Sequence, residues 1–253
     1  MEQTTKINNT IYEIYGERWY SAYDDPIALL RAENRLKVPW IYERILKLSV
    51  KDPKVLDVGC GAGFLCNAFA EKGLSMTGLD NSPESLRIAS LHDRTGKVLY
   101  KTGDAYALPF ADESMDVITC LDFLEHVERP GDVIRECARV LKPDGLFFYH
   151  TFNRNFLSWL LVIKAIEFLV KNTPKDMHVI ELFITPHELK HYCLEAGLEV
   201  KEIIGLRPKF STIPLKSYFS GVVPKSLEFT LTSSVLLSYM GVASKSMGLP
   251  KSL

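Results

Sequence analysis

The sequence predicts an α/β protein with a doubly wound, mostly parallel sheet of seven strands and an N-terminal helical cap. Two observations predict this fold class. Between about residues 55 and 205, short apolar or β-branched runs alternate with segments of helical period, as in βα units around a parallel sheet. The first run also leads directly into a glycine-rich turn, which is typical of open α/β sheets that bind a ligand at their carboxyl edge.

Six apolar runs are the predicted strands of the central sheet. They cover residues 55–58, 74–79, 98–102, 117–121, 146–151 and 198–204. Helix signals fall between them: Ser82 and Pro83 form an N-cap and a first helical position, and residues 185–188 (TPHE) form a capping box. The β-formers of residues 227–239 predict late strands.

We expect two parts in the chain. Residues 1–49 predict two or three helices that cap the open carboxyl edge of the sheet, with an amphipathic pattern interrupted at Pro39. Residues 50–253 form the ligand-binding domain. Within it, residues 153–184 are a candidate insertion for membrane or substrate contact.

Composition excludes several classes of protein. Length predicts one to two domains, and 30 Lys+Arg against 31 Asp+Glu disfavour nucleic-acid binding driven by charge. Residues 1–10 are polar, unlike a signal peptide. The scattered cysteines indicate a reducing cytosol and neither a disulfide framework nor a zinc site; they are Cys60, Cys66, Cys120, Cys137 and Cys193. We therefore expect a cytoplasmic protein.

The strongest local motif is the G-x-G-x-G turn of Gly59, Gly61 and Gly63, between a strand and a helix. Glycines let the backbone turn tightly and let a ligand approach closely. A dinucleotide site would need G-x-G-x-x-G, but position 64 is Phe. Asp57 disfavours a pyrophosphate and favours the ammonium and sulfonium cations of S-adenosylmethionine.

Further candidate cofactor-binding residues lie at the ends of other predicted strands. Asp80 ends the second strand, where an acidic side chain can accept hydrogen bonds from both ribose hydroxyls. Asp104 and Ala105 follow the third strand, and Leu121 closes the fourth. An α/β domain with a merely structural glycine turn is the alternative. The set resembles the class I S-adenosylmethionine-dependent methyltransferase family, which is Rossmann-like. The resemblance implies that the glycine loop contacts the methionine moiety of the cofactor. It also implies that Asp80 binds the ribose and that Asp104 lies near the adenine.

Residues 121–127 (LDFLEHV) follow the fourth strand. If a helical turn starts here, Asp122, Glu125 and His126 share one face at i, i+3 and i+4 and can hold a hard divalent cation such as Mg²⁺. The alternative is that this motif simply orients the loop.

Further segments follow the order seen in the ubiquinone-biosynthesis O-methyltransferases. They are residues 34–41 (NRLKVPWI), the glycine loop, the D-x-x-E-H motif, residues 151–155 (TFNRN), His178 and residues 183–189 (FITPHEL). The resemblance covers roughly residues 30–206. It implies methylation of a phenol or catechol oxygen on a polyprenylated ring, in some members with magnesium bound by an E-x-x-E-H motif. Carried over by position, this motif implies a metal site at Asp122, Glu125 and His126.

The chain departs from that family at two positions. Asp122 replaces the usual Glu and shortens one arm by a methylene. Lys37 stands where an Arg is expected to help hold the cofactor's carboxylate, so the charge is kept and the bidentate fork is lost. Arg35 is the alternative partner.

Residues 156–171 (FLSWLLVIKAIEFLVK) predict a helix with a narrow polar stripe of Lys164, Glu167 and Lys171. A helix this apolar is either buried or lies in a membrane interface, and its internal charges argue against spanning. The family resemblance favours the interface. We therefore expect peripheral contact with the inner face of the membrane through this helix.

Methyl transfer to a phenol requires loss of its proton. A cation at the predicted metal site would lower the phenol's pKa; without metal, His126 or His150 is the general base, although a strand-end His is often structural. The candidate catalytic residues are therefore His126, Glu125 and His150. Two alternatives stay open: a methyltransferase for another small or lipid substrate, and a non-catalytic, membrane-associated cofactor-binding subunit.

Overall fold

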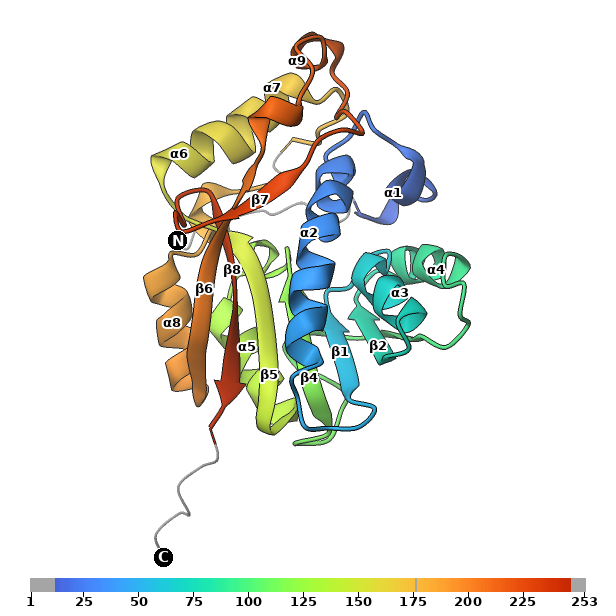
Figure 1. The fold of residues 1–253 in the computed structure, drawn as a ribbon, viewed down its shortest axis with the longest axis vertical. Helices are drawn as coiled ribbons and strands as arrows, with labels where there is room; N and C mark the ends of the chain where they lie inside the picture. Colours follow the sequence, from blue (N-terminus) through green and yellow to red (C-terminus); the bar gives the residue numbers. More distant parts are fainter. Residues whose placement is uncertain (1–11, 176, 247–253) are drawn as a thin grey trace, which may run out of the picture.

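The computed structural model describes residues 12–175 and 177–246, and its centre is one sheet with helices on both faces (Figure 1). The strands are β1 (Lys54–Val58), β2 (Ser75–Asp80), β3 (Leu99–Thr102), β4 (Met115–Leu121), β5 (Leu141–Phe152), β6 (Leu198–Pro208), β7 (Phe229–Thr232) and β8 (Ser238–Lys245). Their spatial order is β3-β2-β1-β4-β5-β8-β6-β7. The predicted α/β fold with a mostly parallel sheet is confirmed.

The predicted number of seven strands is one too low for the described part of the chain, which has eight. The difference lies in residues 227–239, which a turn at 233–237 divides between two strands. One of them, β7, pairs antiparallel with β6 at the sheet edge. The other, β8, runs antiparallel between β5 and β6.

Strand order reverses beside β1, and this reversal positions the site. The chain moves outward from β1 to β2 and β3, then returns so that β4 pairs with β1 on its other side. Because all four strands are parallel, their carboxyl ends open onto one edge of the sheet. A crevice at such a switch point is where open α/β sheets bind ligands.

The described helices either pack on a face of the sheet or lie beyond its carboxyl edge (Figure 1). They are α1 (Arg18–Ser21), α2 (Ile27–Ile45), α3 (Phe64–Glu71), α4 (Pro83–Leu91), α5 (Pro130–Val140), α6 (Phe156–Ser158), α7 (Ala165–Leu169), α8 (Pro186–Glu195) and α9 (Ser217–Ser220). The Ser82 hydroxyl accepts from the Ser85 N–H at the start of α4. The capping box of Thr185 and Glu188 begins α8. Both predicted caps are confirmed.

Two apolar clusters lie on opposite faces of the sheet. On one face, α5 and α8 bury residues such as Ile134 and Leu189 against Phe147. On the other, α2 and α3 bury Trp40 and Phe69 with strand residues of β1, β4 and β5. The sheet is thus doubly wound, as predicted.

Helix α2 continues through Pro39, so the predicted interruption is absent. A proline inside a helix removes one backbone hydrogen bond. The residues that follow it, Trp40, Ile41 and Ile45, are buried against the sheet, and this tertiary packing offsets the local cost. The amino-terminal half of α2, with α1, lies over the carboxyl edge of the strands (Figure 1).

Residues 156–169 form one helical segment: α6, the π-helical turn η3 (Trp159–Lys164) and α7. Lys164 and Glu167 of the predicted polar stripe form an ion pair of 2.7 Å. Val162 and Ile163 are buried, whereas Phe168 is 87% exposed. Among the described residues, no helix combines the length and the apolar character that crossing a bilayer requires.

Candidate active site

The glycine loop leaves β1 in a conformation that requires its glycines. Gly59, Gly61 and Gly63 have φ values of 70°, 50° and 76°, in the left-handed region that side chains rarely adopt. The loop is held by Asp80, whose Oδ2 accepts from the Gly61 N–H at 2.8 Å. The Oδ1 of Asp80 accepts from the Ser82 N–H at 2.9 Å. One carboxylate thus joins the loop to the start of α4.

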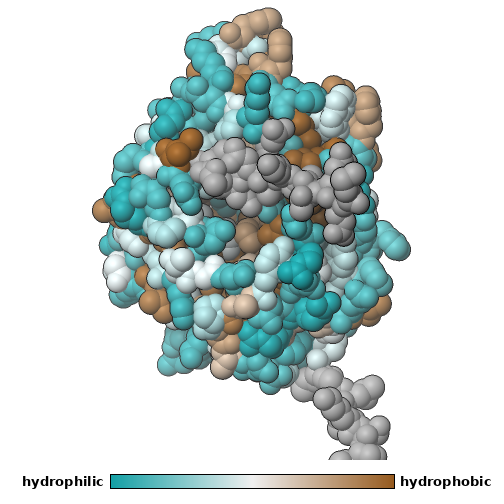
Figure 2. Space-filling model, turned by 180° about the vertical axis from the view of Figure 1, so that it is seen from behind, coloured by the Kyte–Doolittle hydropathy of each residue, from teal (hydrophilic) through white to brown (hydrophobic). Residues whose placement is uncertain are grey.

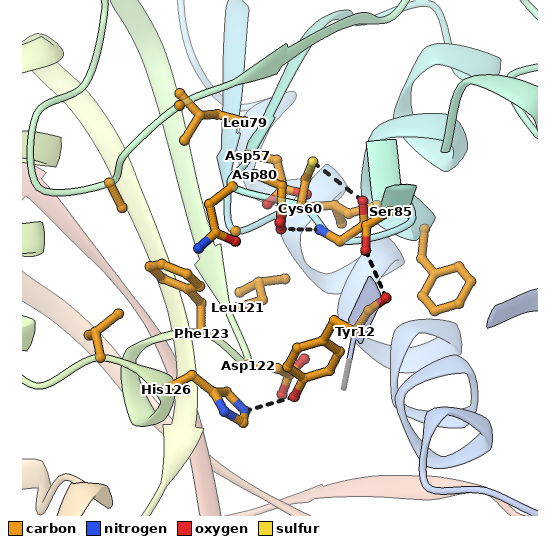
Figure 3. A pocket seen from close by; sticks show the side chains of 18 of the residues that line it. Tyr12, Asp57, Cys60, Leu79, Asp80, Ser85, Leu121, Asp122, Phe123 and His126 are labelled. Carbon is orange, nitrogen blue, oxygen red and sulfur yellow. Dashed lines mark hydrogen bonds between the residues drawn. The ribbon is translucent and has the colours of Figure 1, made fainter. Parts of the chain in front are cut away.

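A cavity of about 580 Å³ opens at this edge of the sheet (Figure 3), a volume typical of small-molecule sites. Its lining includes the predicted cofactor residues Asp57, Gly59, Gly61, Asp80, Asp104, Ala105 and Leu121. The cradle of left-handed glycines and the carboxylates at the ends of β1 and β2 fit a cofactor that carries hydroxyls and cations. Two predicted residues are placed elsewhere. Gly63 is the N-cap residue of α3, and Lys37 donates to Asp122; neither lines this cavity.

Several lining residues come from the N-terminal segment, and sequence reasoning missed them. Tyr12 and Trp19 line the cavity, and so do Leu30 and Asn34 of α2. The Trp19 ring packs against Gly61, where an added Cβ would lie 3.1 Å from it. The sequence does contain a sign of this wall, because Tyr12, Tyr15 and Trp19 are spaced at i, i+3 and i+7. In the structure these three residues pack as an aromatic cluster. The N-terminal segment therefore forms a wall of the site.

A second cavity, of about 330 Å³, adjoins the first and is mostly apolar. Its walls include Leu161, Ala165 and Ile166 from the helical segment, and Ile213 and Val223 from the chain between β6 and β7. Polar groups gather at one end: Glu33, Asp122, Glu125, His126 and His178. The residues that line both cavities are Tyr12, Leu30, Asp122 and His126. The two cavities therefore meet at Asp122 and His126.

His126 lies at this junction on the 3₁₀ helix η2 (Leu124–His126), and its Nε2 is 3.3 Å from the Tyr12 hydroxyl (Figure 3). Burial, reinforced by the nearby His178, lowers the pKa of His126 to about 3. The imidazole is therefore neutral at pH 7. A neutral imidazole has a lone pair that can accept a proton from a substrate hydroxyl.

Glu125 and His150, the other predicted catalytic residues, are both completely buried. Glu125 lines the apolar cavity and accepts from the Thr151 hydroxyl at 2.8 Å. Burial and the charge of Asp122 raise the pKa of Glu125 to about 8, so its carboxyl is mostly protonated at pH 7. His150 lines neither cavity, and its Nδ1 lies 2.5 Å from Asp122 Oδ1. His150 thus contacts Asp122 at the junction without lining either cavity.

The three predicted metal ligands line the second cavity, but they do not lie on one helical turn. Asp122 follows β4 with φ +54°, and η2 starts two residues later, so Asp122, Glu125 and His126 do not share one helical face. Of the residues that the structure describes, one group has three ligand atoms within 4.8 Å of one another: Glu33, Asp122 and His150. The trio of Asp122, Glu125 and His126 is not such a group among the described residues, and its role as a metal site stays a prediction.

Lys37 occupies the middle of that other group. Its Nζ donates to Glu33 Oε2 at 2.5 Å and to Asp122 Oδ2 at 2.7 Å, and it lies 3.0 Å from His150 Nδ1. Burial alone would lower the pKa of Lys37, but the carboxylates of Asp122 and Glu33 raise it above its usual value. Burial likewise opposes ionisation of Asp122, but Lys37 and His150 hold its pKa well below the usual range. The pair is therefore ionised. Lys37, expected at the cofactor's carboxylate, is instead committed to this cluster.

The ionisation of Asp57 predicts a pH dependence for cofactor affinity. Burial, opposed by hydrogen bonds from Thr119 and Cys66, raises the pKa of Asp57 to about 7. A cationic ligand favours the carboxylate and lowers this pKa, so binding releases a proton and tightens as pH rises. Calorimetry should show S-adenosylmethionine affinity increasing from pH 6 to pH 8, with a flatter and weaker profile for Asp57→Asn. Equal pH slopes for the two proteins would contradict the assignment.

Known proteins with similar sequences agree with this geometry. Residues 56–149 match the family model described as a methyltransferase domain. A ubiquinone biosynthesis O-methyltransferase from Pseudomonas putida is 40% identical over 198 residues, which cover 77% of this chain and 84% of that protein. The protein of the same name from Pseudomonas entomophila is 41% identical over the same shares.

Solved structures with little sequence identity share the fold. A S-adenosylmethionine-dependent methyltransferase from Methanosarcina mazei superposes with a TM-score of 0.57 at 23% identity, covering 82% of this chain and 99% of that one. A Pyrococcus horikoshii protein gives 0.58 at 21% identity, covering 85% and 92%. At these identities the likeness shows the architecture alone.

Proposed function

The chain belongs to the family of ubiquinone biosynthesis O-methyltransferases, and from this premise we propose that it methylates a phenol oxygen on a polyprenylated aromatic ring. The chain is a S-adenosylmethionine-dependent methyltransferase by family. The observation that carries the proposal is the meeting of two unlike cavities at Asp122 and His126.

The second cavity fits the two ends of such a substrate. Its apolar walls, from residues 161–170 and from the chain around Ile213 and Val223, suit a hydrocarbon tail. Its polar end, with His126 and Asp122, suits the ring hydroxyl. A substrate seated in this way would direct its oxygen toward the cofactor cavity. This proposal gives residues 153–184 the role of a substrate insertion and keeps the expected division of the chain at residues 49 and 50.

S-adenosylmethionine supplies the methyl group when bound, and the chain's own residues prepare the acceptor. Neutral His126 accepts the phenol proton, so that the oxygen carries the electron pair that forms the new bond. The walls of the two cavities would hold the methyl donor beside the acceptor oxygen, and positioning of this kind supplies about 7–11 kcal/mol in well-oriented reactions. Glu125, protonated at pH 7, adds no second negative charge beside Asp122.

Filling the apolar cavity tests this function. Ala165 lines that cavity and not the cofactor cavity, so Ala165→Phe should remove room for the tail. We expect kcat/KM for a farnesylated catechol to fall by at least about tenfold, which equals about 1.4 kcal/mol, while that for bare catechol changes little. The bare ring is the control within each protein. Equal losses on both substrates, or none, would contradict the placement of the tail.

A hydrophobic tip formed by α7 and α9 supports a further part of the proposal, that the enzyme works in the cytoplasm on the inner face of the membrane. Figure 2 shows hydrophobic side chains at the end of the molecule where α7 and α9 lie. Phe168 on α7 and Phe219 on α9 are each 87% exposed. Exposed lysines, such as Lys171 and Lys216, accompany them. Apolar tips with basic neighbours bind anionic interfaces.

Vesicle flotation tests this membrane contact. Burying one Phe side chain stabilises by about 1.5–3 kcal/mol, so Phe168→Glu with Phe219→Glu should lower the vesicle-bound fraction by at least about tenfold. Leu194→Glu is the matched control, because Leu194 is 73% exposed but lies on α8. Flotation on anionic vesicles that survives in the double variant, with its fold intact by circular dichroism, would rule out this docking surface.

A further inference from the structure

The buried Lys37 cluster has the donor set of a metal site and already contains a cation. Glu33, Asp122 and His150 present two carboxylates and an imidazole whose ligand atoms lie within 4.8 Å of one another. Such a set suits a divalent ion in both ligand type and spacing. The Lys37 Nζ lies 2.5–3.0 Å from an atom of every member.

The position of Lys37 is fixed by α2 and by burial. Glu33 and Lys37 are one helical turn apart on the same face. The Lys37 side chain is completely buried, and a buried ammonium persists only when opposite charges and hydrogen bonds surround it. Its removal would leave two carboxylates facing each other without a counter-charge.

We propose that the Lys37 ammonium is the resident cation of this active site, standing where a divalent ion would be held by Glu33, Asp122 and His150, and that methyl transfer by this chain needs no metal. The statement that methyl transfer needs no metal rests on the proposed function. The statement that Lys37 is the resident cation does not depend on it.

Lys37 acts on the reaction through Asp122. It lines neither cavity, whereas Asp122 lines both. By holding both oxygens of Asp122, at 2.8 and 2.7 Å, the ammonium fixes this carboxylate at the junction. It also offsets the carboxylate's charge, which would otherwise repel the negative charge that develops on the phenol oxygen. Lys37 is therefore a positioning residue, distinct from the proton acceptor His126.

Cobalt binding to the EDTA-stripped full chain tests which cation the cluster holds, because Co²⁺ bound by nitrogen and oxygen ligands is visible by absorption. We expect wild type to show no saturable site. Lys37→Ala should bind one equivalent at least about tenfold more tightly, and Lys37→Ala with Asp122→Ala should lose this site. Lys47→Ala, which removes an exposed lysine just beyond α2, should behave as wild type.

Each outcome decides the proposal. One-equivalent binding by wild type as tight as that by Lys37→Ala, or no gain of affinity in Lys37→Ala, would overturn the assignment of the cation. The cobalt measurement on the wild-type protein remains informative even if a variant fails to fold. For turnover, we expect stripped and magnesium-supplied enzyme to agree within about twofold, and loss of turnover restored by Mg²⁺ would overturn metal independence. Absence of methyl transfer under every condition would instead count against the proposed function, and the cobalt result would still stand.

Discussion

Replacing His126 with Gln is expected to lower kcat on a prenylated catechol by about 10²–10⁴-fold, the usual contribution of a positioned general base. His126 lies at the junction of the two cavities and is neutral at pH 7. Its lowered pKa makes it a weaker base than a solvent-exposed imidazole, so we expect the proton to move to it while the methyl group is transferred. Glutamine keeps the polarity of the site but has no basic lone pair. Initial rates with saturating S-adenosylmethionine measure the effect.

Two controls separate catalysis from binding in this variant. Cofactor affinity should stay within about threefold of wild type, because the glycine loop, Asp80 and Asp104 are unchanged. His191→Gln, which removes an exposed histidine on α8, should leave kcat unaltered. A His126→Gln enzyme with wild-type turnover would show that another group takes the proton.

Replacing Asp122 with Ala is expected to destabilise the fold by about 3–5 kcal/mol, the usual cost of removing one partner from a buried ion pair. The ammonium of Lys37 would keep Glu33 but lose its two bonds to Asp122. Urea unfolding followed by circular dichroism measures the change.

The double variant Asp122→Ala with Lys37→Met tests whether the unpaired Lys37 ammonium causes the loss of stability in Asp122→Ala. Because Met fills a similar volume without charge, we expect it to recover part of the loss. Glu228→Ala is the comparison, since it breaks an exposed pair with Lys209 and should cost at most about 1 kcal/mol. A loss below about 1 kcal/mol in Asp122→Ala would show that the cluster contributes little to stability.

The sequence predicts those parts of the site that depend on residues close together in the chain. The G-x-G-x-G turn needs left-handed glycines wherever it occurs, and the capping box at Thr185 begins a helix by local hydrogen bonds alone. Asp80 follows from strand position, because it ends a predicted strand next to the loop. Local chemistry determines these features, and the structure places them as expected.

The helical turn that the metal motif assumes is absent from the structure. The i, i+3, i+4 spacing of Asp122, Glu125 and His126 assumes a helical turn that begins at Asp122. The backbone there is left-handed, and the helix begins later. This conformation is uncommon for a residue other than glycine and occurs often at functional sites. The spacing in the sequence gives no sign of it.

The other site features that the sequence did not predict depend on contacts between residues far apart in the chain. Lys37 meets Asp122 across 85 positions and His150 across 113, and only the folded sheet brings them together. The i, i+4 spacing of Glu33 and Lys37 was the one local sign of the cluster. Likewise, Tyr12 reaches His126 across 114 positions. Sequence alone identified the participants at the strand ends, but not the helix that supplies their counter-charge.

The most direct test of the account is the identity of the methylated product. Purified full-length protein, S-adenosylmethionine and a farnesylated catechol in mixed micelles are incubated, and the product is identified by mass spectrometry and NMR. The account predicts one methyl ether on a ring oxygen, formed with a higher kcat/KM than on bare catechol. A folded, cofactor-binding protein that forms no ether, or that methylates a ring carbon, would contradict it.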